Sequence, residues 1–579
     1  MSVALSSLKS VIPLTLLFAG ILFSMASFAQ GVQQMVIEQS EEFSYRGSAG
    51  MRALKGNVRL RHNQTVMYCD SALMFDGGRQ AKAYGRVRIV EPGENLQVRC
   101  RYLEFDAEAG SARLYQDVVL TDDAFRLYAP ELTYNTSRRE VTYTQGAKMV
   151  DGSARLESRL GRYDVGSGDM IFIQDVILED DSLTLTADSL RYNRKSGRMY
   201  FIAPTNFSGR GTEMETSGGW YELRSKFGHF FPNCSMRQEN RYFLWSDSLY
   251  VDQNRGSGKA SGRVQWIDTV QDFEIRARCL QFDRTRSSYK AWGNPLLRSF
   301  GAEADDTSPD FKPVQQDPLP RDTFNLTADT IIALKAPQVN AGPIPSAKKG
   351  AQADSSWLFF AWGKVAGQST DAVMRCDSLI YHQSDSSALL IGSPRIWPAS
   401  FQLSGPLMKV KFQGKNAGML VLPEGGVLAD RVNDSLFHQI TAARIEINYD
   451  SGAIQSLQAI ARSLVLYHVT GDDSGYIGLN RITSDSLYMY FTRQRPNRMV
   501  FLGKPEGILW PPTEVPSGED SVPGFQWEGQ LKIQASEQIQ FSVLQNPNRG
   551  GYELFPSKNP LGGLERNGSK NAKRKSRRR

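Results

Sequence analysis

A degenerate unit of about 29 residues recurs along this chain and restricts it to repetitive folds. The unit is marked by an aromatic residue followed by Asp, Asn or Glu, and successive marks lie 29 positions apart, at Phe105, Tyr134, Tyr163, Tyr192 and Tyr221. A second segment keeps the same phase, because Gln116-Asp-Val-Val-Leu120 returns 58 positions later as Gln174-Asp-Val-Ile-Leu178. Two separate signals with one period indicate a repeat array.

Each unit is predicted to be a β-hairpin with one apolar face. A leucine often stands two positions before the aromatic, which places both side chains on the same face of a strand. A glycine four or five positions later, together with Asp or Asn, is typical of a short hairpin turn. Because few windows show helical spacing, we predict an all-β fold with almost no helix. The candidate inward-facing residues are Leu103, Phe105, Leu132, Tyr134, Leu185, Leu190, Tyr192, Leu249, Leu280 and Phe282.

The regularity of the copies suggests how the chain is divided. Copies run from about residue 50 to 300, so we expect a first β-segment over residues 30–300. Residues 301–356 are rich in proline and are interpreted as a linker or an inserted loop, although 324–331 is similar to a further copy. Looser copies predict a second β-segment over residues 357–545, which ends in short strands up to about residue 543. Residues 546–579 are expected to form a disordered basic tail.

The two ends of the chain have distinct compositions. Residues 1–29 resemble a secretory signal peptide, with Lys9, an apolar run from Val11 to Phe23 and a small-x-small site at Ser27–Ala29. We therefore expect export to the periplasm, with an uncleaved N-terminal anchor as the alternative. The net charge is +7, but eight basic residues from Arg566 onward contribute +8 and include no acid among them, so the body is near −1. That balance argues against nucleic-acid binding and leaves the tail as a solubilising end or a tether to anionic lipid head groups.

No arrangement of residues predicts catalysis, a metal or a cofactor. The five histidines are scattered, and the five cysteines form no CxxC pair. Small buried thiols are a better interpretation of the cysteines than disulfides. Repeated Asp-Ser pairs, such as those beginning at Asp70, Asp188 and Asp247, could bind Ca²⁺ or act on a polysaccharide. They lie where the apolar alternation changes face, which favours a structural corner in the strand.

These elements together resemble the OstA/LptA family of lipopolysaccharide-transport proteins. The resemblance is carried by Gly56-Asn-Val-Arg-Leu60, by Ala187-Asp-Ser-Leu-Arg-Tyr-Asn193 and by Gly197-Arg-Met-Tyr200. It covers roughly residues 50–300, and 370–500 more weakly. It implies an elongated β-jellyroll of two facing sheets whose apolar interior holds the acyl chains of lipopolysaccharide. It also implies that open strand edges stack on other jellyroll proteins of the transport bridge, or on a second copy.

On this basis we expect a non-enzymatic protein of the Gram-negative envelope with two tandem jellyroll segments. It would carry or bridge lipopolysaccharide between the inner and outer membranes, with association to the outer membrane left open. Two alternatives remain. One is a structural or adhesive envelope solenoid with the same fold. The other is a parallel β-helix enzyme acting on polysaccharide, although such coils run closer to twenty residues and lack a hairpin in each unit.

Overall fold

The computed structural model describes residues 34–299, 324–335 and 356–545, apart from short gaps at 48–49, 92–94, 124, 182, 210, 271, 399, 414–415, 451, 472–474 and 494. The predicted signal peptide and the basic tail lie outside the described residues. Within the described part, no helix has the length and apolarity needed to cross a membrane. The chain forms two compact units, residues 1–210 and residues 211–579, and each is described by itself.

The described part of the first unit consists of antiparallel strands and a short 3-10 helix, η2 (Asp76–Gly78). Its described strands are β1 (Val36–Gln39), β2 (Glu42–Arg46), β3 (Met51–His62), β4 (Thr65–Phe75), β5 (Gln80–Val90), β6 (Leu96–Asp106), β7 (Ser111–Asp122), β8 (Phe125–Asn135), β9 (Glu140–Tyr143), β10 (Ala147–Asp151), β11 (Ala154–Ser158), β12 (Leu160–Asp164), β13 (Asp169–Glu179), β14 (Thr184–Asn193), β15 (Arg198–Phe201) and β16 (Thr205–Gly209).

Each long strand of this unit turns a corner near its middle. The pairing register between β7 and β8 shifts between Tyr115 and Val118, and the two residues in the gap, Gln116 and Asp117, both have positive φ. The same shift occurs between β13 and β14 at Gln174 and Asp175. Two left-handed residues in a bulge bend the strand sharply, so its halves belong to two different sheets. The apolar alternation changes face at the same place, as the sequence predicts.

The two sheets of the first unit enclose one core. His62, at the end of β3 in one sheet, meets Phe105, at the end of β6 in the other, with ring centroids 4.8 Å apart. Phe125 of β8 and Tyr163 of β12 meet in the same way at 5.7 Å. The bends join the sheets along one side, and hairpin turns line the other.

The Asp-Ser pairs lie at these corners. Gly85 has φ +70°, and a Cβ added to it would overlap the carboxylate of Asp70. The next residue, Arg86, donates from Nε to Asp70 Oδ1 at 3.0 Å. The same arrangement occurs at Asp247: a Cβ added to Gly262 would overlap its carboxylate, and Arg263 donates to its Oδ1. Positive φ and the absence of a side chain are both required, so glycine is the residue that fits. The structural interpretation of these pairs agrees with this geometry.

We expect Gly85→Ala to destabilise the first unit by about 2–3 kcal/mol, because it adds a left-handed alanine and a clash with Asp70. Gly152 provides a matched control, since its φ is +62° but nothing lies within 4 Å of an added Cβ. Gly152→Ala should lower the free energy of unfolding by only about 1 kcal/mol. Hydrogen exchange in β4 and β5 measures the difference. Equal effects of the two substitutions would show that the corner tolerates a side chain.

The second unit is built from the same kind of antiparallel pairing. Its described strands are β17 (Thr212–Thr216), β18 (Gly219–Glu222), β19 (Phe227–Phe230), β20 (Cys234–Gln238), β21 (Tyr242–Ser246), β22 (Ser248–Asp252), β23 (Ser257–Asp268), β24 (Phe273–Asp283), β25 (Ser288–Trp292), β26 (Leu296–Ser299), β27 (Phe324–Thr327), β28 (Thr330–Lys335), β29 (Trp357–Gln368), β30 (Ala372–His382), β31 (Ser387–Ile391), β32 (Arg395–Pro398), β33 (Phe401–Ser404), β34 (Leu407–Gln413), β35 (Asn416–Leu422), β36 (Gly426–Arg431), β37 (Phe437–Ala442), β38 (Arg444–Asp450), β39 (Ala453–Thr470), β40 (Tyr476–Thr492), β41 (Arg495–Leu502) and β42 (Glu506–Trp510).

The sheet pairing of the second unit continues through the region expected to be a linker. β27 pairs with β26 on one side and β29 on the other, and β28 pairs with β25 and β29. The copy at 324–331 therefore joins the strands before and after it. The proline-rich stretches 301–323 and 336–355 lie outside the described residues.

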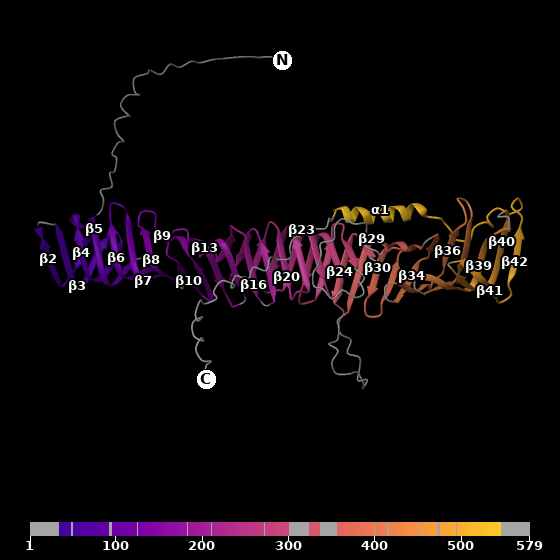
Figure 1. Ribbon diagram of the computed structural model, residues 1–579, viewed down its shortest axis with the longest axis horizontal. Helices are drawn as coiled ribbons and strands as arrows, with labels where there is room; N and C mark the ends of the chain where they lie inside the picture. The colour runs from indigo at the N-terminus through magenta and orange to yellow at the C-terminus, as the bar shows by residue number, and fades with distance from the viewer. Residues whose placement is uncertain are drawn as a thin grey trace, which may run out of the picture. The chain divides into compact units, whose positions relative to one another are not determined.

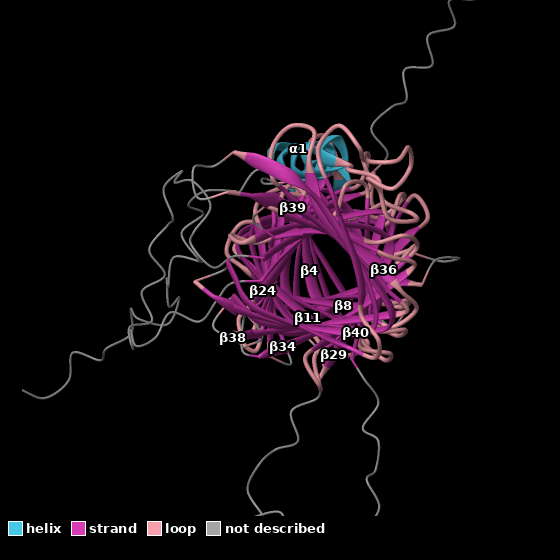
Figure 2. Cartoon of the chain, turned by 90° about the vertical axis from the view of Figure 1, so that its right-hand side faces the viewer, coloured by secondary structure: helices cyan, strands magenta, loops and turns pink. Residues whose placement is uncertain are grey.

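The C-terminal part of the second unit corrects one prediction. Residues 529–545, expected as part of short strands, form the helix α1 (Gly529–Gln545) instead. The helix contacts β27, β29 and β30 and lies outside the strands (Figures 1 and 2). Its apolar residues fall on two opposite faces, so the sequence shows neither the single stripe of a common surface helix nor a strict strand alternation.

A strap, residues 511–528, leads from β42 to this helix across one face of the second unit. Two buried glutamines hold its backbone. Gln402 Oε1 accepts from the backbone N–H of Glu528 at 2.8 Å, and its Nε2 donates to the carbonyl of Gln526 at 2.6 Å. Gln439 bonds the backbone at Val522 and Asp520 in the same way. Because both glutamines are satisfied by main-chain groups, the strap is held in one register.

The described part of the chain is thus all-β apart from α1 and η2, which confirms the predicted fold class. Every strand pairing given above is antiparallel, and hairpins join long neighbours such as β3 and β4 or β7 and β8. A parallel β-helix is therefore ruled out as the fold of these residues.

Candidate functional site

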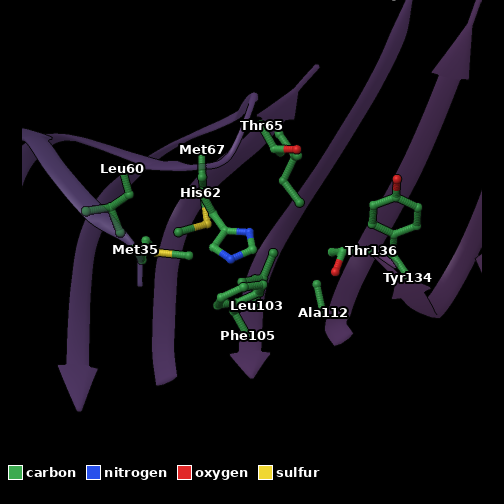
Figure 3. A pocket seen from close by; sticks show the side chains of 11 residues that line it. Met35, Leu60, His62, Thr65, Met67, Leu103, Phe105, Ala112, Tyr134 and Thr136 are labelled. Atoms are coloured by element: carbon green, nitrogen blue, oxygen red, sulfur yellow. The ribbon is translucent and has the colours of Figure 1, made fainter. Parts of the chain in front are cut away.

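A pocket opens at the β1–β3 end of the first unit, between its two sheets (Figure 3). The cavity has a volume of about 40 Å³. Its walls are mostly apolar, and it is lined by Met35, Leu60, His62, Thr65, Met67, Ile89, Leu103, Phe105, Ala112, Tyr134 and Thr136. Three of the ten predicted inward-facing residues, Leu103, Phe105 and Tyr134, are brought together here. The sequence pattern did not single out His62 and Met35, because they precede or end the first regular copy.

The lead-in segment forms part of this pocket. The backbone N–H of Met35 donates to the carbonyl of Gly78 at 3.0 Å, and the Met35 side chain is only 6% exposed. The first strands after it, β1 and β2, pair with β3 and with no other described strand. Phe43 and Tyr45 of β2 are 58% and 60% exposed. The pocket therefore lies beside an open strand edge that carries exposed aromatic rings.

The other predicted residues lie deeper in the two units. Tyr134 is half-buried in the pocket wall, whereas the remaining nine are buried. Leu132, Leu185, Leu190 and Tyr192 belong to the core of the first unit. Leu249, Leu280 and Phe282 belong to the core of the second. Leu185 and Leu190 are 0% exposed, so their neighbours enclose them completely.

This packing sets a physical condition on any long apolar ligand. A cavity of about 40 Å³ holds one or a few water molecules and not an acyl chain. A chain that enters beyond the pocket must displace side chains or separate the two sheets. The unbranched side chains of Met35 and Met67 in the wall can repack around a ligand.

Polar contacts link the two sheets of the first unit along the side that carries the hairpin turns. We call the line where the hairpin turns of the two sheets meet the seam. Tyr163, 2% exposed, donates its hydroxyl to Asp122 Oδ2 at 2.7 Å. Arg194 reaches from the opposite turn to Asp122 Oδ2 at 3.1 Å and to Asp123 Oδ2 at 3.0 Å. Burial, followed by the hydrogen bond to Asp122, raises the pKa of Tyr163, so the hydroxyl stays protonated as a donor.

The seam contact repeats one unit further on. Tyr192 donates its hydroxyl to Asp151 Oδ2 at 2.6 Å, and both residues lie 29 positions after Tyr163 and Asp122. The aromatic residue of the repeat therefore has two roles. Its ring is part of the core, and its hydroxyl ties one sheet to the turn of the other.

The interior of the second unit contains many aromatic rings. Trp266 of β23 stacks on Tyr289 of β25 with centroids 4.0 Å apart. Phe273 of β24 lies 5.2 Å from Phe359 and 6.0 Å from Trp357, both of β29. Edge-to-face contacts of this kind add rigidity to a core. No tryptophan occurs in the first unit, since all nine lie between residues 220 and 527.

The cysteines are free thiols in the structure. Burial raises the pKa of Cys69, Cys100 and Cys376 to about 12 in each case, which makes these thiols unreactive near neutral pH. Among the residues that the structure describes, no group of three His, Cys, Asp or Glu side chains is arranged to hold a metal ion.

Comparison with known proteins finds a family model and solved structures that match parts of this chain. The family model described as OstA-like protein matches residues 33–188, which include β1 to β13 and part of β14. No curated protein matches the chain. Seventeen chains of solved structures match. One is the crystal structure of LptH from Pseudomonas aeruginosa, described as the LptA-homologous periplasmic component of the conserved lipopolysaccharide transport device.

The match to LptH has 11% sequence identity and a TM-score of 0.18, and it covers 19% of this chain and 80% of that chain. At that TM-score the likeness carries no argument about how the strands are arranged. The family model stands by itself and covers the pocket, its open edge and most of the seam. Over residues 33–188 the chain is similar to OstA-like proteins, which confirms the resemblance predicted from the sequence.

Proposed function

We propose that this protein takes part in lipopolysaccharide transport across the periplasm, as a carrier and not as an enzyme. The observation that supports this most strongly is the apolar pocket between the two sheets of the first unit, which lies within the OstA-like residues 33–188. The pocket continues inward as rows of buried aliphatic residues on both sheets. An acyl chain placed there would be stabilised by about 0.8 kcal/mol for each CH₂ group that is removed from water.

The route of entry follows from the packing. The seam is held by buried hydrogen bonds and ion pairs at Asp122, whereas the end pocket is open and lined by flexible methionines. Entry at the pocket therefore requires less disruption than entry through the seam. In this proposal the seven inward-facing residues of the first unit form the path, and the first unit is the part that holds the lipid.

The partners are proposed from the open edges. At one end of the chain, β2 exposes Phe43 and Tyr45 beside the pocket. At the other end, β42 pairs only with β40 among the described strands and exposes Ile508 and Leu509 at 53% and 52%. An unpaired edge with apolar side chains can extend its sheet with a strand of another jellyroll protein or of a second copy. A location in the periplasm follows from the same proposal.

Photo-crosslinking in living cells tests the proposal. A photoreactive residue in place of Tyr134, in the pocket wall, should capture lipopolysaccharide, as should one in place of Tyr192. One in place of the exposed Arg191 or Arg138 should capture little or none, because these side chains face solvent. Arg191 is a matched control, since it directly precedes Tyr192 on β14 and points to the opposite face.

Two outcomes would count against lipid transport. Equal capture at inward and outward positions would indicate nonspecific contact with lipid. No capture at any position, with an intact envelope after deletion of residues 50–300, would favour the structural solenoid, which has the same fold but no lipid in its interior.

A further inference from the structure

One sheet of the first unit carries arginines on its outer face. We define the arginine face as two cross-strand rows of outward positions on strands β3 to β8, all on the same side of the corners. The rows are Arg59, Tyr68, Arg88, Arg99, Val119 and Tyr128, and Arg61, Val66, Val90, Gln97, Thr121 and Arg126. These twelve positions include five arginines and no Asp or Glu. Residues 34–210 carry 24 Lys or Arg and 24 Asp or Glu, so the positive excess belongs to this face and not to the unit as a whole.

Few acidic groups neutralise the arginine face. Glu38 of β1 lies 2.7 Å from the Nε atoms of both Arg59 and Arg61. The other three arginines, at 88, 99 and 126, are exposed and form no ion pair with any residue that the structure describes. The Arg88 guanidinium lies over the ring of Tyr68, 4.5 Å from its centroid, which orients it without neutralising it.

The arrangement of two of these arginines is unfavourable for folding. Arg88 and Arg99 lie directly opposite each other on β5 and β6. Like charges in that position destabilise a sheet. A phosphate group placed between the two guanidiniums would replace this repulsion with charge-assisted hydrogen bonds. The pair is therefore better explained by an anionic ligand than by stability.

The extent of the arginine face indicates what kind of ligand it fits. From β3 to β8 the rows cross five strand spacings, or roughly 24 Å. The arginines stand along these rows and do not converge on one point, so they match a surface that presents many phosphates. Tyr68 and Tyr128 lie in the same row, and tyrosine is enriched at membrane–water interfaces. A lipid surface is therefore the partner that this face fits.

We propose that the arginine face docks the first unit on a membrane surface that contains anionic phospholipids. Clusters of four to eight basic residues are typical of such binding. Strands β3, β4 and β5 also line the apolar pocket from the inner side, through Leu60, Met67 and Ile89. Docking would thus hold one wall of the pocket against the lipid surface. The inference does not depend on lipid being carried in the first unit.

Vesicle binding by the full chain tests this inference. The protein should sediment with vesicles of phosphatidylcholine and phosphatidylglycerol more strongly than with phosphatidylcholine alone, and high salt should weaken the binding. The triple variant Arg88→Gln, Arg99→Gln, Arg126→Gln should lower partitioning to the anionic vesicles by roughly tenfold or more. Its thermal unfolding should be unchanged or shifted upward, because the substitutions remove a like-charge pair.

A charge-matched control separates this face from net charge. Lys55, Arg113 and Arg138 are exposed, and the first two lie on the other sheet, before the corners of β3 and β7. Their triple replacement by Gln removes the same charge and should leave vesicle binding close to that of the wild type. Equal losses in the two triple variants, or no loss in either, would overturn the proposal. Salt-sensitive dimerisation of the wild type that only the Arg88, Arg99 and Arg126 variant lacks, with equal vesicle binding by all proteins, would overturn it in favour of a second copy as the partner.

Discussion

Leu190→Asp should unfold the first unit or lower its free energy of unfolding by at least several kcal/mol. Leu190 is 0% exposed in β14 and lies opposite Phe172 of β13 and Phe201 of β15. A carboxylate placed there has no partner, and an unpaired buried charge costs several kcal/mol. Domains of this size are stable by about 5–15 kcal/mol in total, so one such substitution removes much of the margin.

Arg191→Asp is the control for charge at the neighbouring position. Arg191 is exposed, pairs with Asp169 at 3.2 Å and lies over the ring of Tyr200. Its replacement should cost about 1 kcal/mol, which is typical for an exposed ion pair. Hydrogen exchange in β13 to β15 measures both variants. A Leu190→Asp variant as stable as Arg191→Asp would contradict the placement of the repeat leucine in the core.

The composition of the chain helps this experiment. All nine tryptophans occur between residues 220 and 527, so they belong to the second unit. Tryptophan fluorescence therefore follows the unfolding of the second unit alone. An unchanged fluorescence transition in Leu190→Asp, with lost protection in β13 to β15, would show that the two units unfold separately.

The period-two pattern explains why the strands and their faces could be predicted. A leucine two positions before an aromatic shares its face in any strand, and the structure buries Leu103 with Phe105 and Leu190 with Tyr192. The glycines after the aromatic correctly marked the hairpin turns, because Gly110, Gly168 and Gly197 have positive φ. Local preference and tertiary packing agree at these positions, so the sequence alone was sufficient.

The seam and the helix could not be predicted in the same way. Tyr163 and Asp122 are 41 positions apart, and nothing local to either residue indicates that they meet. A signal existed, however, because Tyr192 and Asp151 repeat the same separation. The corner residues Gln116 and Asp117 have positive φ without being glycine, so composition did not mark them. For α1, the tertiary contacts of its inner face decide the structure over a weak local pattern.

Acid should destabilise the second unit through His438 of β37. Burial, with a smaller effect of the nearby His468, lowers the pKa of His438 to about 4 from its usual 6.5. His438 Nδ1 also accepts the backbone N–H of His468 at 3.1 Å, and a protonated Nδ1 could not accept it. The unfolded state therefore binds this proton first. The contribution of His438 is fully present above about pH 6.5 and is lost as the pH falls towards 4.

Allowing for the partial exposure of the ring, we expect roughly 2 kcal/mol of stability to be lost over that range because of His438. His438→Asn keeps an acceptor for the His468 N–H but cannot be protonated, so its tryptophan-monitored unfolding should lose less stability between pH 6.5 and 4. Burial also lowers the pKa of His229 and His468 in this unit, so part of the acid dependence should persist in the variant. His382→Asn, at an exposed position on β30, should follow the wild type. If His438→Asn keeps the full acid dependence of the wild type, the imidazole of His438 is not the group that responds, and other groups, such as His229 and His468, must be responsible.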